Sequence, residues 1–304
     1  MENKNYQIIL PGSGHEYSVG LNGENITIKG VNETTLSLNT QNKYDLNGTD
    51  EEQAVFLEAL FGHHPDLNVV TLNNKDISRV DFYQNPLLWL RNKEQSKEEV
   101  MVETNGVQHP LRPEHFHGIH YSRFIPSINK TLSLRTITLD DLDTFHEWHN
   151  QSRVAFFWEL AQEKTELKKY IEDGLAKKHQ IPMIIEADGE SVGYFEFYWV
   201  REDRLGPYYE SRPYDRGFHF LIGNQNFLGR SNTDAVLQSA LHFMYLDDQR
   251  TQFIMAEPRH DNARVLKYAE ESIGWQALKV FDFPHKRAVL LQNSRDQFFK
   301  GARL

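Results

Sequence analysis

Apolar and polar residues alternate most clearly at residues 191–200, SVGYFEFYWV. Because successive side chains of a strand point to opposite faces, this segment is predicted to be a strand that places Glu196 among aromatic residues. A buried carboxylate is costly unless a partner pairs with it. A shorter apolar run at 218–222 carries His219 in a similar setting, and the loop between the two runs is rich in charged residues. The pattern therefore predicts a place where a carboxylate, a histidine and a charged loop meet.

From residue 130 onward the period of the apolar pattern switches regularly between 2 and 3.6, the periods of strands and helices. Strands are predicted at 132–137, 181–187, 191–200, 218–222, 252–257, 276–283 and 286–292, and helices at 138–148, 163–177, 233–246 and 261–273. Two β–α–β crossovers follow an antiparallel front half. This order predicts an α/β (α+β) fold with a mixed central sheet flanked by helices.

The first part of the chain, residues 1–108, reads as a smaller β-rich domain. Its strand-like runs are separated by Gly and Asn turns, and Thr49 with Glu52 forms a capping box at the start of a helix. It contains no chemical motif, so a degenerate second copy of the main fold and a dimerisation layer both stay open. Residues 109–129 contain three prolines and no clear periodicity, which is typical of a linker. The main domain is predicted to span residues 130–304.

Composition narrows the class of protein. The formal net charge is −10 and no Lys/Arg run exceeds two residues, so a nucleic-acid partner is not expected. The chain contains no Cys, which excludes a disulfide, a thiolate nucleophile and a Cys-ligated metal centre. Neither a membrane span nor a secretory pattern is present, and a cytoplasmic location is predicted.

The turn before the helix at 233–246 offers a candidate phosphate site. It consists of Gly229, Arg230, Ser231, Asn232 and Thr233, which place free backbone N–H groups and one arginine at a positive helix end. Ser231 or Asn232 could equally serve as an ordinary N-cap, and only one glycine is present. This turn alone therefore favours the cap.

Longer blocks of sequence resemble a known family. GYFEFYWVREDRLGPYY, YDRGFHFLIG, AEPRHDNARV and FDFPHKRAVLL are similar to signature blocks of the hydroxamate-siderophore N-acyltransferases of the GNAT superfamily, of the aerobactin and mycobactin type. HPLRP also recurs in the aerobactin-type members. The resemblance extends over residues 109–299. It implies the GNAT acyltransferase fold and an acyl-CoA-dependent enzyme that needs no metal.

The resemblance also implies roles for particular residues. His219 and Glu257 would be catalytic: Glu257 would accept the proton released as the N–C bond forms, and His219 would orient the hydroxamate oxygen or relay the proton. The cofactor-binding positions would be Leu221, Ile222, Gly223, Gly229, Arg230, Ser231, Asn232, Thr233 and Asn262. Ser231 and Thr233 replace two glycines usual in this loop. The tyrosine acid of many GNAT enzymes would fall at Ala269, so no tyrosine acid is assigned.

The acceptor side of the cleft is expected to combine carboxylates, which would hold a cationic end, with aromatic rings that flank an aliphatic chain. The substrate-binding candidates are Trp158, Glu196, Glu202, Asp203, Asp215, Arg216 and His285. A solvated loop is the simpler interpretation of Glu202, Asp203 or Arg204 taken alone. His285 could line the cleft or occupy a turn.

The sequence thus favours acetyl transfer from acetyl-CoA to the hydroxylamine nitrogen of N6-hydroxylysine, for siderophore synthesis. N-hydroxycadaverine, N-hydroxyputrescine or N5-hydroxyornithine as acceptor, and succinyl or a longer acyl group, stay open. A homodimer and contacts with other pathway enzymes also stay open. From other classes, two alternatives are a non-catalytic scaffold and a metal-binding protein that uses His109, His115, His117 and His120. Prolines interrupt that histidine cluster and it lacks the i,i+4 spacing of a helical zinc motif, so no metal is expected.

Overall fold

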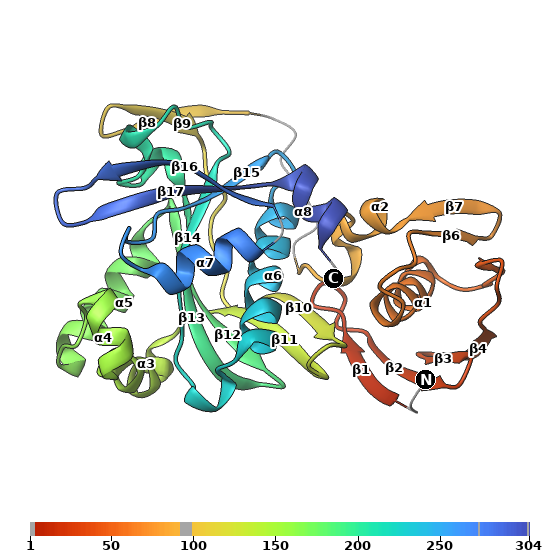
Figure 1. The fold of residues 1–304 in the computed structure, drawn as a ribbon. Helices are drawn as coiled ribbons and strands as arrows, with labels where there is room; N and C mark the ends of the chain where they lie inside the picture. The colour runs from red at the N-terminus through yellow and green to blue at the C-terminus, as the bar shows by residue number, and fades with distance from the viewer. Residues whose placement is uncertain (1–3, 92–98, 273, 303) are drawn as a thin grey trace.

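A mixed eight-stranded sheet forms the centre of the protein, in the order β10-β11-β12-β13-β14-β15-β17-β16 (Figure 1). The structure is a computed structural model that describes residues 4–91, 99–272, 274–302 and 304. All neighbouring strands of the sheet are antiparallel except β14 and β15, which are parallel. The strands are β10 (Ile119–Ile125), β11 (Lys130–Thr136), β12 (Gln180–Ala187), β13 (Glu190–Trp199), β14 (Arg216–Ile222), β15 (Phe253–Ala256), β16 (Trp275–Asp282) and β17 (Arg287–Ser294). The predicted mixed sheet is confirmed.

Helices cover both faces of this sheet, as predicted. On one face α3 (Leu142–His149) and α5 (Lys164–Ala176) pack over Tyr194 and Leu221. On the other face α6 (Arg230–Asp247) packs over Phe195 and Phe218. The alternation along β13 thus separates two apolar layers. The remaining helices of this part are α4 (Ser152–Trp158), α7 (Ala263–Glu271), α8 (Arg295–Gly301) and the short 3-10 helices Leu139–Asp141, Val200–Glu202, Gly206–Tyr208 and Gln225–Phe227.

The two parallel strands at the centre of the sheet separate soon after they meet. Their pairing involves only Arg216 with Ile254 and Gly217 with Met255. β14 continues along β13 as far as Ile222, so among the described residues its edge at 218–222 has no ladder partner on β15. Backbone N–H and C=O groups on this edge need partners from elsewhere, which makes it a place where an extended ligand could bind.

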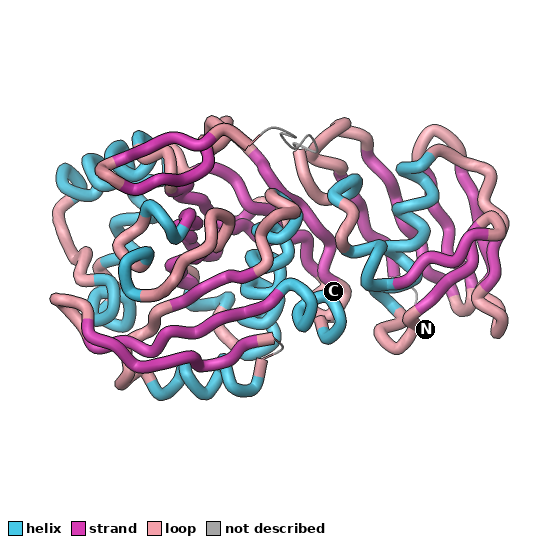
Figure 2. Tube along the Cα trace, turned by 90° about the horizontal axis from the view of Figure 1, so that it is seen from above, coloured by secondary structure: helices cyan, strands magenta, loops and turns pink. Residues whose placement is uncertain are grey.

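The N-terminal part lies beside the central sheet (Figure 2). It contains the antiparallel sheet β1 (Lys4–Ile9), β2 (Glu16–Asn22), β3 (Asn25–Lys29) and β4 (Glu33–Ser37), and a small sheet of β5 (Lys43–Tyr44), β6 (Val69–Leu72) and β7 (Lys75–Ser78). The helices are α1 (Asp50–His63), α2 (Arg79–Tyr83) and the 3-10 helix Pro86–Leu88. The predicted capping box of Thr49 and Glu52 opens α1. A hairpin of β8 (Met101–Thr104) and β9 (Val107–Pro110) follows.

Strand β10 falls inside the predicted linker 109–129, and this corrects that prediction for residues 119–125. Arg123 of β10 is buried, and its Nε donates to Oε1 of buried Glu58 on α1 at 3.0 Å. Because Arg123 is a charged residue at a buried position, the sequence of β10 does not show the usual alternation of apolar and polar residues. Tyr121 on the same strand bonds to His242 of α6, which in turn contacts the carbonyl of Tyr83. The N-terminal part is therefore joined to the central sheet through a buried polar network. Among the described residues, no helix combines the length and apolar character that crossing a membrane requires.

Candidate active site

His219 lies between two buried carboxylates. Glu196 of β13 is the direct cross-strand partner of His219 on β14, and its Oε2 lies 3.0 Å from Nδ1. Glu257 directly follows β15, and its Oε1 lies 2.9 Å from Nε2 of His219. The carboxylate side chains are only 6% and 1% exposed, whereas that of His219 is 22% exposed. The strand order thus brings three ionisable groups from distant segments into one chain of hydrogen bonds.

Tyrosine hydroxyls satisfy the remaining oxygens of these carboxylates. Tyr170 and Tyr194 donate to Oε1 of Glu196 at 2.5 and 3.1 Å. Tyr198 donates to Oε2 of Glu257 at 2.9 Å. Burial, together with the neighbouring carboxylates, raises the pKa of all three tyrosines far above the ordinary value, so they act as donors at neutral pH.

A glycine makes room for one of these tyrosines. Gly217 is the cross-strand partner of Tyr198, and a Cβ atom on Gly217 would lie 2.4 Å from the Tyr198 ring. Real Cβ atoms do not approach a ring so closely, so any larger residue would push Tyr198 away from Glu257.

Electrostatics fix the charges of this chain of groups. Burial of the imidazole opposes protonation, but the two carboxylates outweigh it and raise the pKa of His219 to about 9. Burial alone would raise the pKa of Glu257, yet His219, Lys286 and Arg204 hold it well below its usual range. The pKa of Glu196 is also lowered, since hydrogen bonds from His219 and the tyrosines outweigh its burial. At neutral pH the centre is an imidazolium between two carboxylates.

Two further cations approach Glu257. Nη2 of Arg204 lies 3.6 Å from Oε1 of Glu257 and 3.2 Å from Nε2 of His219, and the Arg204 side chain is 49% exposed. Lys286 donates to the backbone carbonyl of Glu257 at 2.7 Å, and its Nζ lies 3.5 Å from Oε1. Arg204 is therefore more exposed than the other charged groups of this centre.

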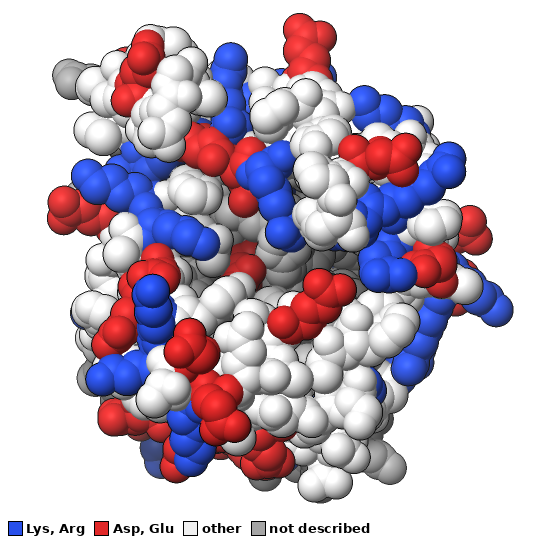
Figure 3. All heavy atoms as spheres, turned by 90° about the vertical axis from the view of Figure 1, so that its left-hand side faces the viewer, with Lys and Arg blue, Asp and Glu red and all other residues white. Residues whose placement is uncertain are grey.

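Aromatic side chains line the approach to His219. The Trp158 ring lies 6.4 Å from the His219 ring, edge on. His285 stacks on Phe283 at 5.3 Å. Burial raises the pKa of Asp203, and the charge of the nearby His219 imidazolium opposes this rise only in part. Figure 3 shows the face that carries α3, α4 and α5: it is hollowed in the middle and has basic and acidic side chains on its rim.

Glu202, a predicted substrate residue, is engaged by other residues of the protein. Its side chain is 5% exposed and accepts two hydrogen bonds from Arg112, at 2.5 and 2.6 Å. His109 lies 2.9 Å from the same carboxylate. Glu202 therefore forms a buried ion pair beneath the loop.

Asp215 and Arg216, also predicted as substrate residues, have protein partners in the structure. Asp215 is 2% exposed and accepts a hydrogen bond from the Tyr209 hydroxyl at 2.8 Å. Arg216 is three positions before His219 on the same strand, so its side chain points to the opposite face. There it donates to Asp247 at 2.6 Å. Glu196 does lie at the centre, but its oxygens are taken by His219 and two tyrosines rather than left free for a cation.

The N-terminus of α6 lacks a side-chain cap. The helix begins at Arg230, with Gly229 as N-cap at φ 131°, so Ser231 and Asn232 lie in its first turn and do not cap it. The first-turn N–H groups therefore face outward at the positive end of an 18-residue helix. Arg230 is engaged by Asp234 and by Glu271 of α7. Among the described residues, the ordinary side-chain cap that the turn alone suggested is therefore not formed.

The other predicted cofactor residues are divided between several environments. Leu221 lies on the face of β14 that carries His219, and Ile222 lies on the other face. Oδ1 of Asn262 caps α7 by accepting from the N–H of Val265 at 3.2 Å. The carbonyl of Gly223 accepts hydrogen bonds from Arg153 and Gln151, and a Cβ on Gly223 would overlap the Trp148 ring.

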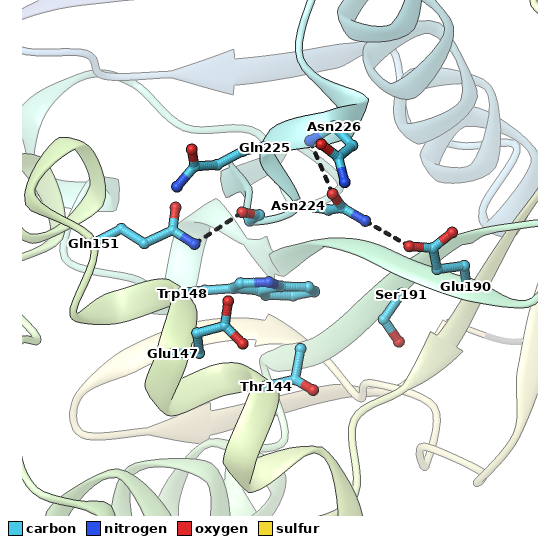
Figure 4. A pocket seen from close by; sticks show the side chains of 10 residues that line it. Thr144, Glu147, Trp148, Gln151, Glu190, Ser191, Asn224, Gln225 and Asn226 are labelled. Atoms are coloured by element: carbon cyan, nitrogen blue, oxygen red, sulfur yellow. Dashed lines mark hydrogen bonds between the residues drawn. The ribbon is translucent and has the colours of Figure 1, made fainter.

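A polar pocket of about 500 Å³ lies at this end of β14 (Figure 4). It is lined by Thr144, Glu147, Trp148, Gln151, Glu190, Ser191, Gly223, Asn224, Gln225 and Asn226. Neither His219 nor Glu257 belongs to its lining. The pocket is thus separate from the carboxylate–histidine centre.

The histidines of the predicted metal alternative have separate partners. His109 contacts Glu202 and Thr104, and His120 bonds to Thr136 and to the carbonyl of Phe116. Within the described residues, no group of three or more His, Asp or Glu side chains is placed to hold a metal ion.

Several residues of the centre were not predicted from the sequence. Tyr194 and Tyr198 could have been found, because strand parity puts them on the face of Glu196. Tyr170 on α5 and Lys286 in the turn before β17 reach the centre only through tertiary packing. Arg204 is half exposed, as a residue of a solvated loop would be, but its side chain contacts His219 and Glu257.

The chain is similar in sequence to known acetyltransferases and acyltransferases. The family model for the acetyltransferase (GNAT) domain matches residues 138–283. The chain is 36% identical over 226 residues to the N(6)-hydroxylysine O-acetyltransferase of Escherichia coli, covering 73% of this chain and 71% of that protein. It is 37% identical over 201 residues to an N(5)-hydroxyornithine:cis-anhydromevalonyl coenzyme A-N(5)-transacylase of Beauveria bassiana, covering 63% of this chain but only 43% of the fungal protein.

Solved structures share the fold. An uncharacterised protein of Bacillus halodurans is 31% identical with a TM-score of 0.56, over 59% of this chain and 92% of that one. The aminoglycoside acetyltransferase AAC(6')-Ib in complex with coenzyme A is 24% identical with a TM-score of 0.51, over 56% of this chain and 98% of that one. The chain therefore belongs to the GNAT acetyltransferases, in the group that contains the hydroxylysine and hydroxyornithine acyltransferases.

Proposed function

We propose that the protein transfers the acetyl group of acetyl-CoA to the hydroxylamine nitrogen of N6-hydroxylysine and so forms a hydroxamate for siderophore synthesis. The observation that carries the proposal is the His219 imidazole held between Glu196 and Glu257, beside an edge of β14 that within the described residues does not pair with β15 after Gly217. The likeness to the E. coli enzyme, whose name gives N6-hydroxylysine as acceptor, supports the choice of acceptor.

The proposed chemistry assigns different roles to the two central residues. The hydroxylamine nitrogen attacks the thioester carbon, the N–C bond forms, and the C–S bond breaks as CoA leaves as its thiolate. Glu257, which is ionised, accepts the proton from nitrogen. His219 already carries a proton on both ring nitrogens, so it acts as a donor that orients the hydroxyl oxygen. An amine substrate placed between Nε2 of His219 and Oε1 of Glu257 would lengthen the hydrogen bond between them. Glu257 would then be a stronger base, because the imidazolium would stabilise its ionised form less.

Acyl-CoA would bind along β14 and at the start of α6. The unpaired backbone edge at 218–222 suits the amide groups of an extended pantetheine chain. The uncapped N–H groups of Arg230, Ser231 and Asn232, with Gly229 and Thr233 at either side, suit the pyrophosphate. Glu196 is proposed as the residue that positions His219, with Trp158, Asp203 and His285 lining the acceptor side.

The test is CoA release by the purified protein with acetyl-CoA and matched acceptors: N6-hydroxylysine, N-hydroxycadaverine, N-hydroxyputrescine, N5-hydroxyornithine and their unhydroxylated parents. A ferric colour reaction identifies a hydroxamate and so separates N-acylation from O-acylation. We expect turnover with N6-hydroxylysine and a coloured product. Turnover without the ferric colour would reject transfer to nitrogen. No turnover with any N-hydroxyamine would reject the proposal as a whole.

A further inference from the structure

Three atoms on the open side of the centre form a small triangle. Nε2 of His219 lies 2.9 Å from Oε1 of Glu257, Nη2 of Arg204 lies 3.2 Å from that Nε2, and the same Nη2 lies 3.6 Å from that Oε1. Two corners are N–H groups of cations and one is a carboxylate oxygen. An imidazolium and a guanidinium are both donors, so their contact is not a hydrogen bond. Both cations face the same carboxylate oxygen.

The backbone holds Arg204 at this position. Asp203 accepts from the N–H of Leu205 at 3.1 Å, and the Leu205 side chain is fully buried. At Gly206, an added Cβ would lie 2.8 Å from backbone carbonyl oxygens of the preceding turn, so the chain there is tightly folded. The guanidinium also lies over the Phe283 ring, 5.9 Å from its centre. An exposed arginine is thus directed at the reactive pair rather than left free on a solvated loop.

The triangle matches an N-hydroxyamine and not an alkylamine. A neutral N-hydroxyamine offers an N–H donor, which Glu257 can accept, beside an oxygen, which Arg204 and His219 can both donate to. At neutral pH an ordinary alkylamine is an ammonium ion with N–H donors, a positive charge and no acceptor. It would meet three cations, since Lys286 also lies 3.5 Å from Oε1 of Glu257.

On the basis of the proposed function, we infer that Arg204 selects the N-hydroxylated amine, because its guanidinium binds the hydroxyl oxygen of the acceptor and repels the ammonium group of the unhydroxylated parent. The guanidinium charge of Arg204 is half exposed and therefore screened by water. Within about 5 Å of the acceptor nitrogen, such a charge supports about tenfold discrimination between the N-hydroxylated amine and its unhydroxylated parent. Arg204 is therefore a specificity-determining residue that separates the product of a hydroxylation step from its precursor.

The experiment compares kcat/KM for N6-hydroxylysine with kcat/KM for lysine, at saturating acetyl-CoA and pH 7. It uses the wild type, Arg204→Gln, Arg204→Lys and, as a matched control, Arg287→Gln, which removes an exposed arginine at the Asp282 ion pair instead. We expect the ratio to fall about tenfold in Arg204→Gln, to fall less in Arg204→Lys, and to stay unchanged in Arg287→Gln. The inhibition constant of lysine against N6-hydroxylysine gives a second readout, and it should tighten in Arg204→Gln.

The outcomes separate this inference from the function on which it rests. An active wild type whose ratio and lysine inhibition constant are the same in Arg204→Gln would reject the role of Arg204 and leave the proposed function standing. A wild type with no turnover of any N-hydroxyamine would reject both. Circular dichroism shows whether Arg204→Gln is folded. The ratio of the two kcat/KM values does not depend on the fraction of active protein.

Discussion

Nε2 of His219 lies 2.9 Å from Oε1 of Glu257, and the other ring nitrogen of His219 is held by Glu196. Both nitrogens of the imidazole are thus committed to carboxylates. A histidine in this position donates rather than accepts protons, and the carboxylate facing the open side becomes the candidate base. This relationship supports the roles that the family resemblance implies, with Glu257 as the base and His219 as the group that orients the oxygen.

Removing the carboxylate of Glu257 is expected to abolish most of the activity. Glu257→Gln keeps the shape of the side chain but leaves no base, so kcat should fall by about 100-fold or more, with KM for acetyl-CoA changed by less than about twofold. CoA release measures both constants. Glu270→Gln, an exposed change on α7, is the control. A Glu257→Gln enzyme that keeps a tenth of the kcat or more would exclude this residue as the base.

The pH profile should show the charge of His219. Its pKa is raised to about 9, so the imidazolium is present below that pH and kcat/KM should fall as the pH rises through about 9. Glu196→Gln removes a negative charge 3.0 Å from Nδ1, and the alkaline limb should therefore move to lower pH. Rates measured between about pH 6.5 and 10 test this, with exposed Glu172→Gln as the control. An alkaline limb that is the same in both variants would show that Glu196 does not set the charge of His219.

Local periodicity predicted much of the fold and the position of Glu196, one of the two carboxylates beside His219. Alternation along 191–200 located β13 and placed Glu196 among aromatic rings, and helical spacing located α3, α5, α6 and α7. Strand parity carries further information: Arg216 is an odd number of positions from His219, so its side chain points to the opposite face.

Long-range partners account for what the sequence could not supply. Glu202 pairs with Arg112, ninety positions earlier in the chain, and a local sequence pattern cannot predict a contact over that separation. The start of α6 was misplaced because its N-cap is a glycine without a capping side chain. The approach of Lys286 to Glu257 likewise depends on how β15 and the β16–β17 hairpin pack, which is a property of the folded sheet.

The uncapped helix end makes a prediction about acyl-CoA binding. Ser231→Asp would place a carboxylate beside the first-turn N–H groups of α6, where it is favourable for the helix but repels a pyrophosphate. KM for acetyl-CoA should rise about tenfold while kcat at saturation and the melting temperature do not fall. Ser231→Ala, which adds no charge, should behave like the wild type. Equal KM values in the two variants would place the pyrophosphate elsewhere.

The buried pair of Glu58 and Arg123 should hold the N-terminal part against the central sheet. Both side chains are at most 5% exposed, so Arg123→Met would leave the Glu58 carboxylate buried without its cation. Loss of one partner of a buried pair costs about 3–5 kcal/mol of unfolding free energy, whereas an exposed pair contributes about 0–1 kcal/mol. Urea unfolding followed by tryptophan fluorescence compares Arg123→Met with Lys300→Met, which breaks the exposed pair with Asp296. If the two variants lost similar amounts of stability, the pair would not be what joins α1 to β10. A large loss in Arg123→Met alone, relieved in part by adding Glu58→Gln, would show that the cost arises from the unpaired carboxylate and not from lost packing.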